Sequence, residues 1–185
     1  MLKSIYTLLL FFIGIHSFSQ EIDGTRFAED FEAAYTAYPN IPSGLLEGVA
    51  FAQTRMRHLS GNNAGCSGIP QVKGVMGLTE NGQGYFNDNL NYISGLSGYT
   101  INDIKTNSGV NIMAYAAAYS KIMERKSVAT EDFKGHDQVL KTLSEIPWSK
   151  NAASDFALSC FTYEVFQFMN NETYQSIFDL PARGI

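Results

Sequence analysis

Hydrophobic residues recur along this chain at intervals of three and four positions, the spacing of one face of an α-helix. The clearest case is 111–126, where an alanine-rich centre combines with Ile112, Tyr115, Tyr119 and Met123. Similar patterns predict helices at 25–37, 43–59, 85–96, 100–105, 136–146 and 154–170, with a helical turn at 130–134. No run alternates hydrophobic and polar residues as a half-buried strand does. We therefore expect a mainly α fold with little or no β structure, apart from an irregular turn at 74–78.

Proline and short polar side chains predict where several of these helices begin and end. Pro39 and Pro42 cannot continue a helical ladder and separate the first two helices. Ser43 and Ser154 are expected to cap the second and the last helix. The last helix, 154–170, has aromatic residues on nearly all sides, so we expect it to be the central, buried helix of the fold.

Residues 1–19 have the pattern of a secretory signal peptide. Lys3 supplies the positive charge, 5–15 is apolar, and Ser17 and Ser19 precede an expected cleavage site before Gln20. The apolar run is shorter than the roughly twenty residues that a membrane span needs. We therefore expect a mature domain of residues 20–185, periplasmic or secreted, without a membrane span after cleavage.

Composition narrows the partners and the chemistry. The chain has 185 residues and a formal net charge of -5, which suits one domain and argues against a nucleic-acid partner, since phosphate binding needs a basic face. Neither His-x-x-x-His nor Cys-x-x-Cys spacing occurs. We expect no metal and no cofactor.

The two cysteines leave two possibilities open. An exported protein meets an oxidising environment, which makes Cys66 and Cys160 a candidate disulfide. The alternative is two separate thiols, with Cys160 buried inside the aromatic last helix.

Three short motifs carry most of the functional information. Gln53-Thr54 lies late in the second helix, Gly74-Val75-Met76-Gly77-Leu78-Thr79-Glu80 forms a glycine-bounded turn, and Asn111-Ile112 begins the alanine-rich helix that carries Tyr115 and Tyr119. This order resembles the soluble lytic transglycosylases and goose-type lysozymes, which cleave the glycan of bacterial cell walls. In that family a Glu-Ser pair ends the helix and a Gly-x-Met-Gly-Leu-Met-Gln turn follows.

The resemblance implies a lysozyme-like domain whose partner is the glycan strand of peptidoglycan. It also extends to the N-terminal modules of bacterial cell-wall amidases, which makes a fused or associated N-acetylmuramoyl-L-alanine amidase domain a candidate partner. The glycan-binding residues that it implies are Gln53, Thr54, Met76, Gly77, Asn111, Tyr115 and Tyr119. Each tyrosine has a simpler interpretation as a core residue. Gln53 stands where the family has its acid, and an amide has no proton to transfer, so we expect binding with reduced or no transglycosylase activity.

Two other functions remain open. Glu80 replaces the family's Gln in the turn, and as a displaced catalytic acid it would make the protein an active lytic transglycosylase or lysozyme. The simpler interpretation is that Glu80 is a solvated loop residue. Glu47 lies on a different face of the helix from Gln53, so we do not expect it to be the acid. The other function is that of a non-enzymatic exported helical interaction domain.

Overall fold

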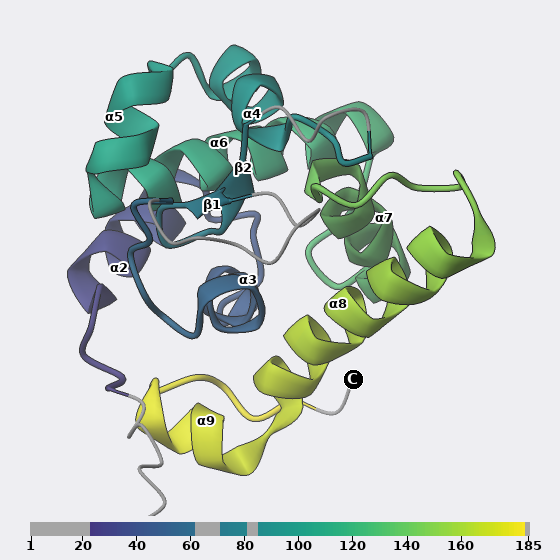
Figure 1. Ribbon diagram of the computed structural model, residues 1–185. Helices are drawn as coiled ribbons and strands as arrows, with labels where there is room; N and C mark the ends of the chain where they lie inside the picture. The colour runs from purple at the N-terminus through teal and green to yellow at the C-terminus, as the bar shows by residue number, and fades with distance from the viewer. Residues whose placement is uncertain (1–22, 62–70, 81–84, 184–185) are drawn as a thin grey trace, which may run out of the picture.

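The computed structural model describes residues 23–61, 71–80 and 85–183 (Figure 1). Its helices are α2 (Ala28–Ala37), α3 (Leu45–Thr54), α4 (Asn89–Ser97), α5 (Ile101–Thr106), α6 (Ser108–Lys126), α7 (Phe133–Leu143), α8 (Ala152–Asn170) and α9 (Glu172–Ile177). Two short strands, β1 (Val72–Lys73) and β2 (Leu78–Thr79), pair antiparallel. The prediction of a mainly α fold is confirmed, and the expected irregular turn is the connection between these strands.

Among the described residues, helix α6 contributes more buried residues than any other helix. Helices α2, α4, α5 and α7 all contact it (Figure 1). Its alanines lie at or near full burial beside the fully buried Ile112 and Tyr119. Small side chains let neighbouring helices approach closely, which is how an alanine-rich stretch becomes the interior of a helical domain.

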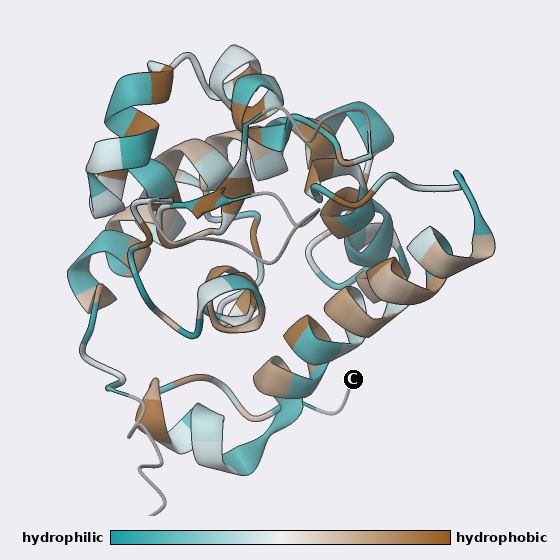
Figure 2. Cartoon of the chain, viewed as in Figure 1, coloured by the Kyte–Doolittle hydropathy of each residue, from teal (hydrophilic) through white to brown (hydrophobic). Residues whose placement is uncertain are grey.

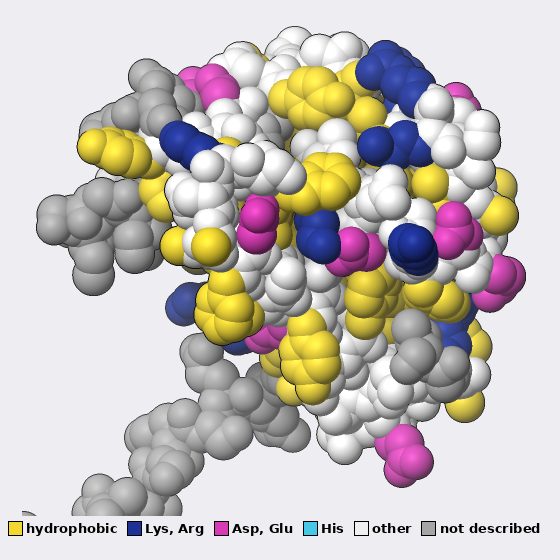
Figure 3. All heavy atoms as spheres, turned by 90° about the vertical axis from the view of Figure 1, so that its right-hand side faces the viewer, with side chains coloured by type: hydrophobic (Ala, Val, Ile, Leu, Met, Phe, Trp, Pro, Cys, Tyr) yellow, Lys and Arg dark blue, Asp and Glu magenta, His cyan; other side chains and the backbone are white. Residues whose placement is uncertain are grey.

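Helix α8, which we expected to be central, lies along one side of the molecule (Figure 1). Phe161 and Phe168 are buried, and α8 packs against α3. Hydrophobic residues nevertheless recur along the whole helix (Figure 2), and Phe156 and Tyr163 are 72% and 70% exposed. On that side of the molecule, hydrophobic side chains lie between charged ones (Figure 3). The expectation of a central, buried last helix is therefore wrong, because only one face of α8 is covered.

The second helix ends five residues earlier than its hydrophobic pattern predicts, at Thr54 rather than at residue 59. Arg55 and Met56 both adopt left-handed conformations, with φ of 53° and 56°. Their backbone N–H groups donate to the carbonyls of Phe51 and Ala50, at 3.0 and 3.3 Å. This pattern closes a helix C-terminus. Glycine usually occupies such positions and is missing here, so the sequence carries no visible stop signal.

The first residue of most helices is set by an N-cap residue, and the hydrophobic periodicity did not always reveal which residue that is. The cap of α5 by Thr100 is as expected, with Asp103 N donating to Thr100 Oγ1 at 3.2 Å. Asn151 rather than Ser154 caps α8, and Gly44, with φ of 87°, precedes α3 in place of Ser43. Side chains of Asp88, Asn107 and Asp132 cap α4, α6 and α7 and set starts that differ from the predicted ones. Helix α2 starts at Ala28, and α9 was not predicted.

The targeting and disulfide predictions fall largely outside the described residues. Residues 1–19 and Cys66 belong to the parts that are not described. Cys160 is exposed on α8 and has no disulfide partner among the described residues, so the alternative of a buried Cys160 is wrong, while its pairing with Cys66 stays a prediction. None of the helices in 23–61, 71–80 and 85–183 has the length and hydropathy to cross a membrane.

Candidate functional site

The C-terminal end of α3 packs directly against the glycine-bounded turn. Thr54 is buried, and its Oγ1 lies 2.7 Å from the carbonyl oxygen of Val75 in the turn. Gly77 has a φ of +65°, and a Cβ at this position would lie 2.6 Å from Gln53 Cβ. Only glycine allows both this conformation and this contact. The turn therefore lies against the side chain of Gln53.

The first turn of α6 also contacts the glycine-bounded turn 74–80, through Asn111. Asn111 is fully buried, its Oδ1 accepts a hydrogen bond from Met76 N at 2.8 Å, and its Nδ2 donates to Ile104 O at 2.9 Å. Gly74 again leaves room: with φ of +72°, a Cβ there would lie 2.0 Å from Asn111 Nδ2. The three motifs that the sequence analysis singled out thus meet at one junction. The side chains of Asn111 and Thr54 hold it together by hydrogen bonds to the backbone of the turn.

Gln53 has a partner that the sequence analysis did not anticipate. Its side-chain Nε2 donates a hydrogen bond to Glu145 Oε2 at 3.1 Å. Glu145 lies in the segment between α7 and α8, and Ser144 Oγ lies 3.3 Å from the same carboxylate oxygen. Gln53 and Glu145 are both half-buried. An amide and a carboxyl group therefore form a polar pair that solvent partly reaches, beside the turn.

The backbone around Glu145 is held in place by the segment that leads into α4. Asn87 N donates to Glu145 O at 2.7 Å, and Asn87 Nδ2 donates to Ser144 O at 3.1 Å. Asn89 links this segment to the turn, since its Oδ1 accepts from Thr79 N at 2.7 Å and its Nδ2 donates to Leu143 O at 3.0 Å. Glu145 is thereby fixed relative to Gln53 by several hydrogen bonds.

The surroundings favour the neutral form of the Glu145 carboxyl group. Burial raises its pKa above the ordinary value for glutamate, while its own backbone N–H, Ser144 and Gln53 oppose the shift by hydrogen bonding to the charged form. Tyr115 is almost fully buried. Burial also raises the pKa of Tyr115, and the charge of Glu145 adds to that effect.

Tyr119 lies farther inside and takes part in a core network. Its hydroxyl lies 2.9 Å from His136 Nδ1, and His136 Nε2 lies 3.0 Å from the carbonyl oxygen of Thr130. A carbonyl only accepts, so Nε2 must carry the proton and the Tyr119 hydroxyl donates to Nδ1. Burial lowers the pKa of His136, which fits this neutral form. Tyr119 therefore follows the simpler interpretation, that of a core residue.

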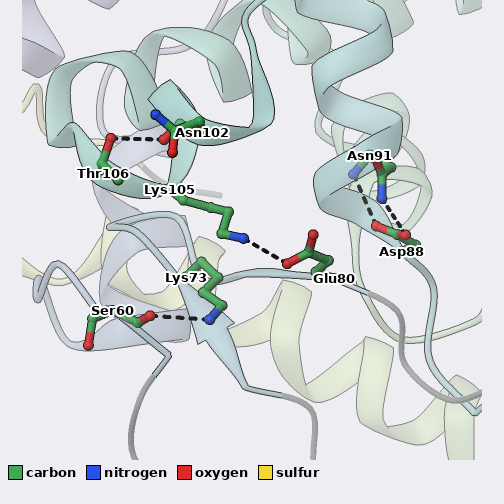
Figure 4. A network of polar contacts seen from close by, with 8 residues as sticks. All are labelled: Ser60, Lys73, Glu80, Asp88, Asn91, Asn102, Lys105 and Thr106. Atoms are coloured by element: carbon green, nitrogen blue, oxygen red, sulfur yellow. Dashed lines mark hydrogen bonds and ion pairs between the residues drawn. The ribbon is translucent and has the colours of Figure 1, made fainter.

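Glu80 points away from the turn toward α5. Its carboxylate is exposed and lies 2.8 Å from Lys105 Nζ. Figure 4 shows this ion pair beside a second lysine contact, in which Lys73 reaches the backbone oxygen of Ser60. The structure thus shows Glu80 as a solvated residue that is paired with a cation, the simpler of its two interpretations.

Glu47 is a second buried carboxyl group, at the opposite end of α3 from Gln53. Tyr35 Oη donates to Glu47 Oε2 at 2.5 Å and accepts from Leu46 N at 3.0 Å. Burial raises the pKa of Glu47 to about 7 despite the hydrogen bond from Tyr35. Glu47 borders a pocket of about 780 Å³ between α2, α3 and the segment after α9. It is separate from the Gln53 junction, in agreement with its exclusion from the predicted site.

No family model matches the chain. No curated protein and no solved structure matches it either. The likeness to lytic transglycosylases therefore rests on the three motifs and on their meeting at one junction. Sequence reasoning missed Glu145 because no motif marks it: it is separated from Gln53 by 92 positions along the chain, and only the fold brings the two together.

Proposed function

We propose that the mature domain, residues 20–185, acts outside the cytoplasm and binds the glycan strands of peptidoglycan at the junction of Gln53 with the turn 74–80. The observation that carries this proposal is the convergence of the three motifs: Thr54 contacts Val75, Gly77 contacts Gln53, and Asn111 contacts Met76. A lysozyme-like domain is the interpretation that accounts for their order. An N-acetylmuramoyl-L-alanine amidase domain, fused or associated, is its proposed partner on the wall.

The polar groups at the junction suit a sugar. Sugar hydroxyl groups both donate and accept hydrogen bonds, and the half-buried Gln53 amide and Glu145 carboxyl group together offer both. Met76, Thr54 and Asn111 are buried, and their part in the proposed site is to hold the turn in place. The side chain of residue 53 has no role as an acid, because a carboxamide does not release a proton at any working pH.

Co-sedimentation with purified peptidoglycan sacculi tests the proposal. The parent protein should pellet with sacculi, and Gln53→Ala should weaken binding by about tenfold, the effect of roughly 1.4 kcal/mol. Gln167→Ala, which removes an exposed glutamine from α8, is the matched control and should bind as the parent does. Parent protein that stays in the supernatant would instead favour the non-enzymatic interaction domain.

The ion pair of Glu80 with Lys105 gives no support to an enzyme that uses Glu80 as its acid. The Glu80 carboxylate is directed toward α5 and is occupied by the ammonium group of Lys105. A general acid must instead hold a proton until it reaches the leaving oxygen.

A further inference from the structure

We propose that the Gln53 junction cleaves the glycan that it binds, with Glu145 as the proton donor in place of residue 53. This inference rests on the proposed function for its substrate. It goes beyond that function because binding alone needs no proton transfer. The hydrogen bond from Gln53 Nε2 to Glu145 Oε2, at 3.1 Å, places a carboxyl group directly at this junction.

The side-chain hydrogen bonds of Glu145 converge on one oxygen of its carboxyl group. Both side-chain contacts of this carboxyl group with described residues, from Gln53 and from Ser144, reach Oε2. Oε2 is therefore the acceptor for both side chains, and in this proposal Oε1 carries the proton of the neutral acid. Because Glu145 is half-buried, solvent partly reaches it, and the proposal is that a bound glycan does so too. Its raised pKa keeps the acid protonated at higher pH than an exposed glutamate would be.

The backbone gives Glu145 the fixed position that a general acid needs. The hydrogen bonds of Asn87 to Glu145 O and Ser144 O hold its backbone, at 2.7 and 3.1 Å. The amide of Gln53 then holds the side chain from α3. Positioning of this kind is a large part of what a catalytic residue requires. Gln53 is in this proposal a positioning residue, and it also offers its amide to the sugar.

The proposed step transfers one proton to the glycan and breaks one glycosidic bond. The proton on Glu145 Oε1 passes to the glycosidic oxygen, the bond from C1 to that oxygen breaks, and its electron pair stays on the oxygen, which becomes a hydroxyl group. The positive charge left at C1 is neutralised by an oxygen nucleophile, whose proton returns to the Glu145 carboxylate. Water as the nucleophile gives a reducing end, and the C6 hydroxyl group of the same sugar gives a 1,6-anhydro end. The acid is regenerated in both cases.

Digestion of purified sacculi by the full chain, with products followed by mass spectrometry, tests the proposal. The parent should release glycan fragments, and Glu145→Gln should lose about 10²–10⁴-fold in rate while still pelleting with sacculi. Glu172→Gln, at an exposed position on α9, is the matched control and should cleave at the parent rate. Either kind of new end would support the step, and the mass distinguishes the two.

A second readout separates catalysis from a structural effect of the substitution. Cleavage should fall as pH rises through the pKa of Glu145, because only the protonated form donates. Gln53→Leu removes the donor that favours the charged carboxylate, so this fall should move to higher pH. Parent protein that binds sacculi without cleaving them would overturn the role of Glu145 and leave the proposed binding intact. Absence of binding would contradict the proposed function itself. Loss of cleavage in Glu80→Gln, with Glu145→Gln still active, would also overturn the role of Glu145 as the proton donor.

Discussion

The amide of Gln53 donates to the carboxyl group of Glu145 across 3.1 Å and joins the end of α3 to the segment after α7. By the resemblance to lytic transglycosylases, residue 53 corresponds to the catalytic acid of that family. Here residue 53 is an amide, and the fold brings the carboxyl group of Glu145 beside it. An amide next to a carboxyl group is a stable combination over a wide pH range, because the amide carries no charge. Two carboxyl groups at the same distance would have to share one proton above acidic pH.

Gln53→Glu should therefore destabilise the protein in a pH-dependent way. The upper pKa of the new pair rises above the unfolded value, so the folded state keeps a proton that the unfolded state has lost. Stability then falls as pH rises through that window. We expect the free energy of unfolding, measured by urea denaturation, to match the parent at about pH 5 and to be lower by about 1–3 kcal/mol at about pH 8. An equal loss at both pH values would mean that the two carboxyl groups do not meet.

The hydrophobic periodicity predicted most of the helices, because period and propensity act within each segment. It failed where a single local contact decides. Arg55 and Met56 end α3 in left-handed conformations that no glycine announces, and Asn151 rather than Ser154 caps α8. The breadth of the hydrophobic pattern on α8 also suggested full burial, although Phe156 and Tyr163 are exposed.

The residues of the candidate site were likewise only partly predictable from the sequence. The motif order correctly grouped Gln53, the turn and Asn111, since glycines and amides in fixed order reflect close backbone packing. It could not reveal Glu145, whose position depends on how the end of α7 meets Asn87 and Asn89. Pairing of residues far apart in sequence is a property of tertiary structure, and a single sequence does not display it.

Asn111 should be essential for the stability of the junction. Asn111→Leu removes the acceptor for Met76 N and the donor to Ile104 O, and both of these backbone groups belong to buried residues. An unsatisfied buried polar group costs about 1–3 kcal/mol, so we expect the free energy of unfolding to fall by about 2–5 kcal/mol. Asn102→Ala, at an exposed position on α5, should change it by less than about 0.5 kcal/mol. A small effect at Asn111 would show that water replaces its contacts.

Gly77 and Gly98 allow backbone strain to be separated from crowding. Both have positive φ, at +65° and +83°, but a Cβ at Gly77 would meet Gln53, whereas nothing lies within 4 Å of one at Gly98. Gly98→Ala should therefore lower the free energy of unfolding by about 1 kcal/mol, for the left-handed conformation alone. Gly77→Ala should lower it by about 1–3 kcal/mol more, because the turn must move away from α3. Equal effects in thermal or chemical denaturation would contradict the contact with Gln53.

Glu47 should make the protein less stable as the pH rises. Its pKa is raised from 4.5 to about 7 in the folded protein, so between these values only the folded state holds the proton. The unfolded state binds fewer protons there, and stability falls across the window. A shift of this size corresponds to about 3 kcal/mol, lost in full above the folded pKa.

Glu47→Gln removes the titration and keeps an oxygen that can accept from Tyr35 Oη. We expect this variant to match the parent at about pH 5 and to exceed its stability by up to about 3 kcal/mol at about pH 8. Urea denaturation at the two pH values measures the difference. Glu172→Gln, on the exposed face of α9, should show no such dependence. A gain in Glu47→Gln that is the same at both pH values would mean that Glu47 is charged in the folded protein throughout, because no proton would then be lost across the window.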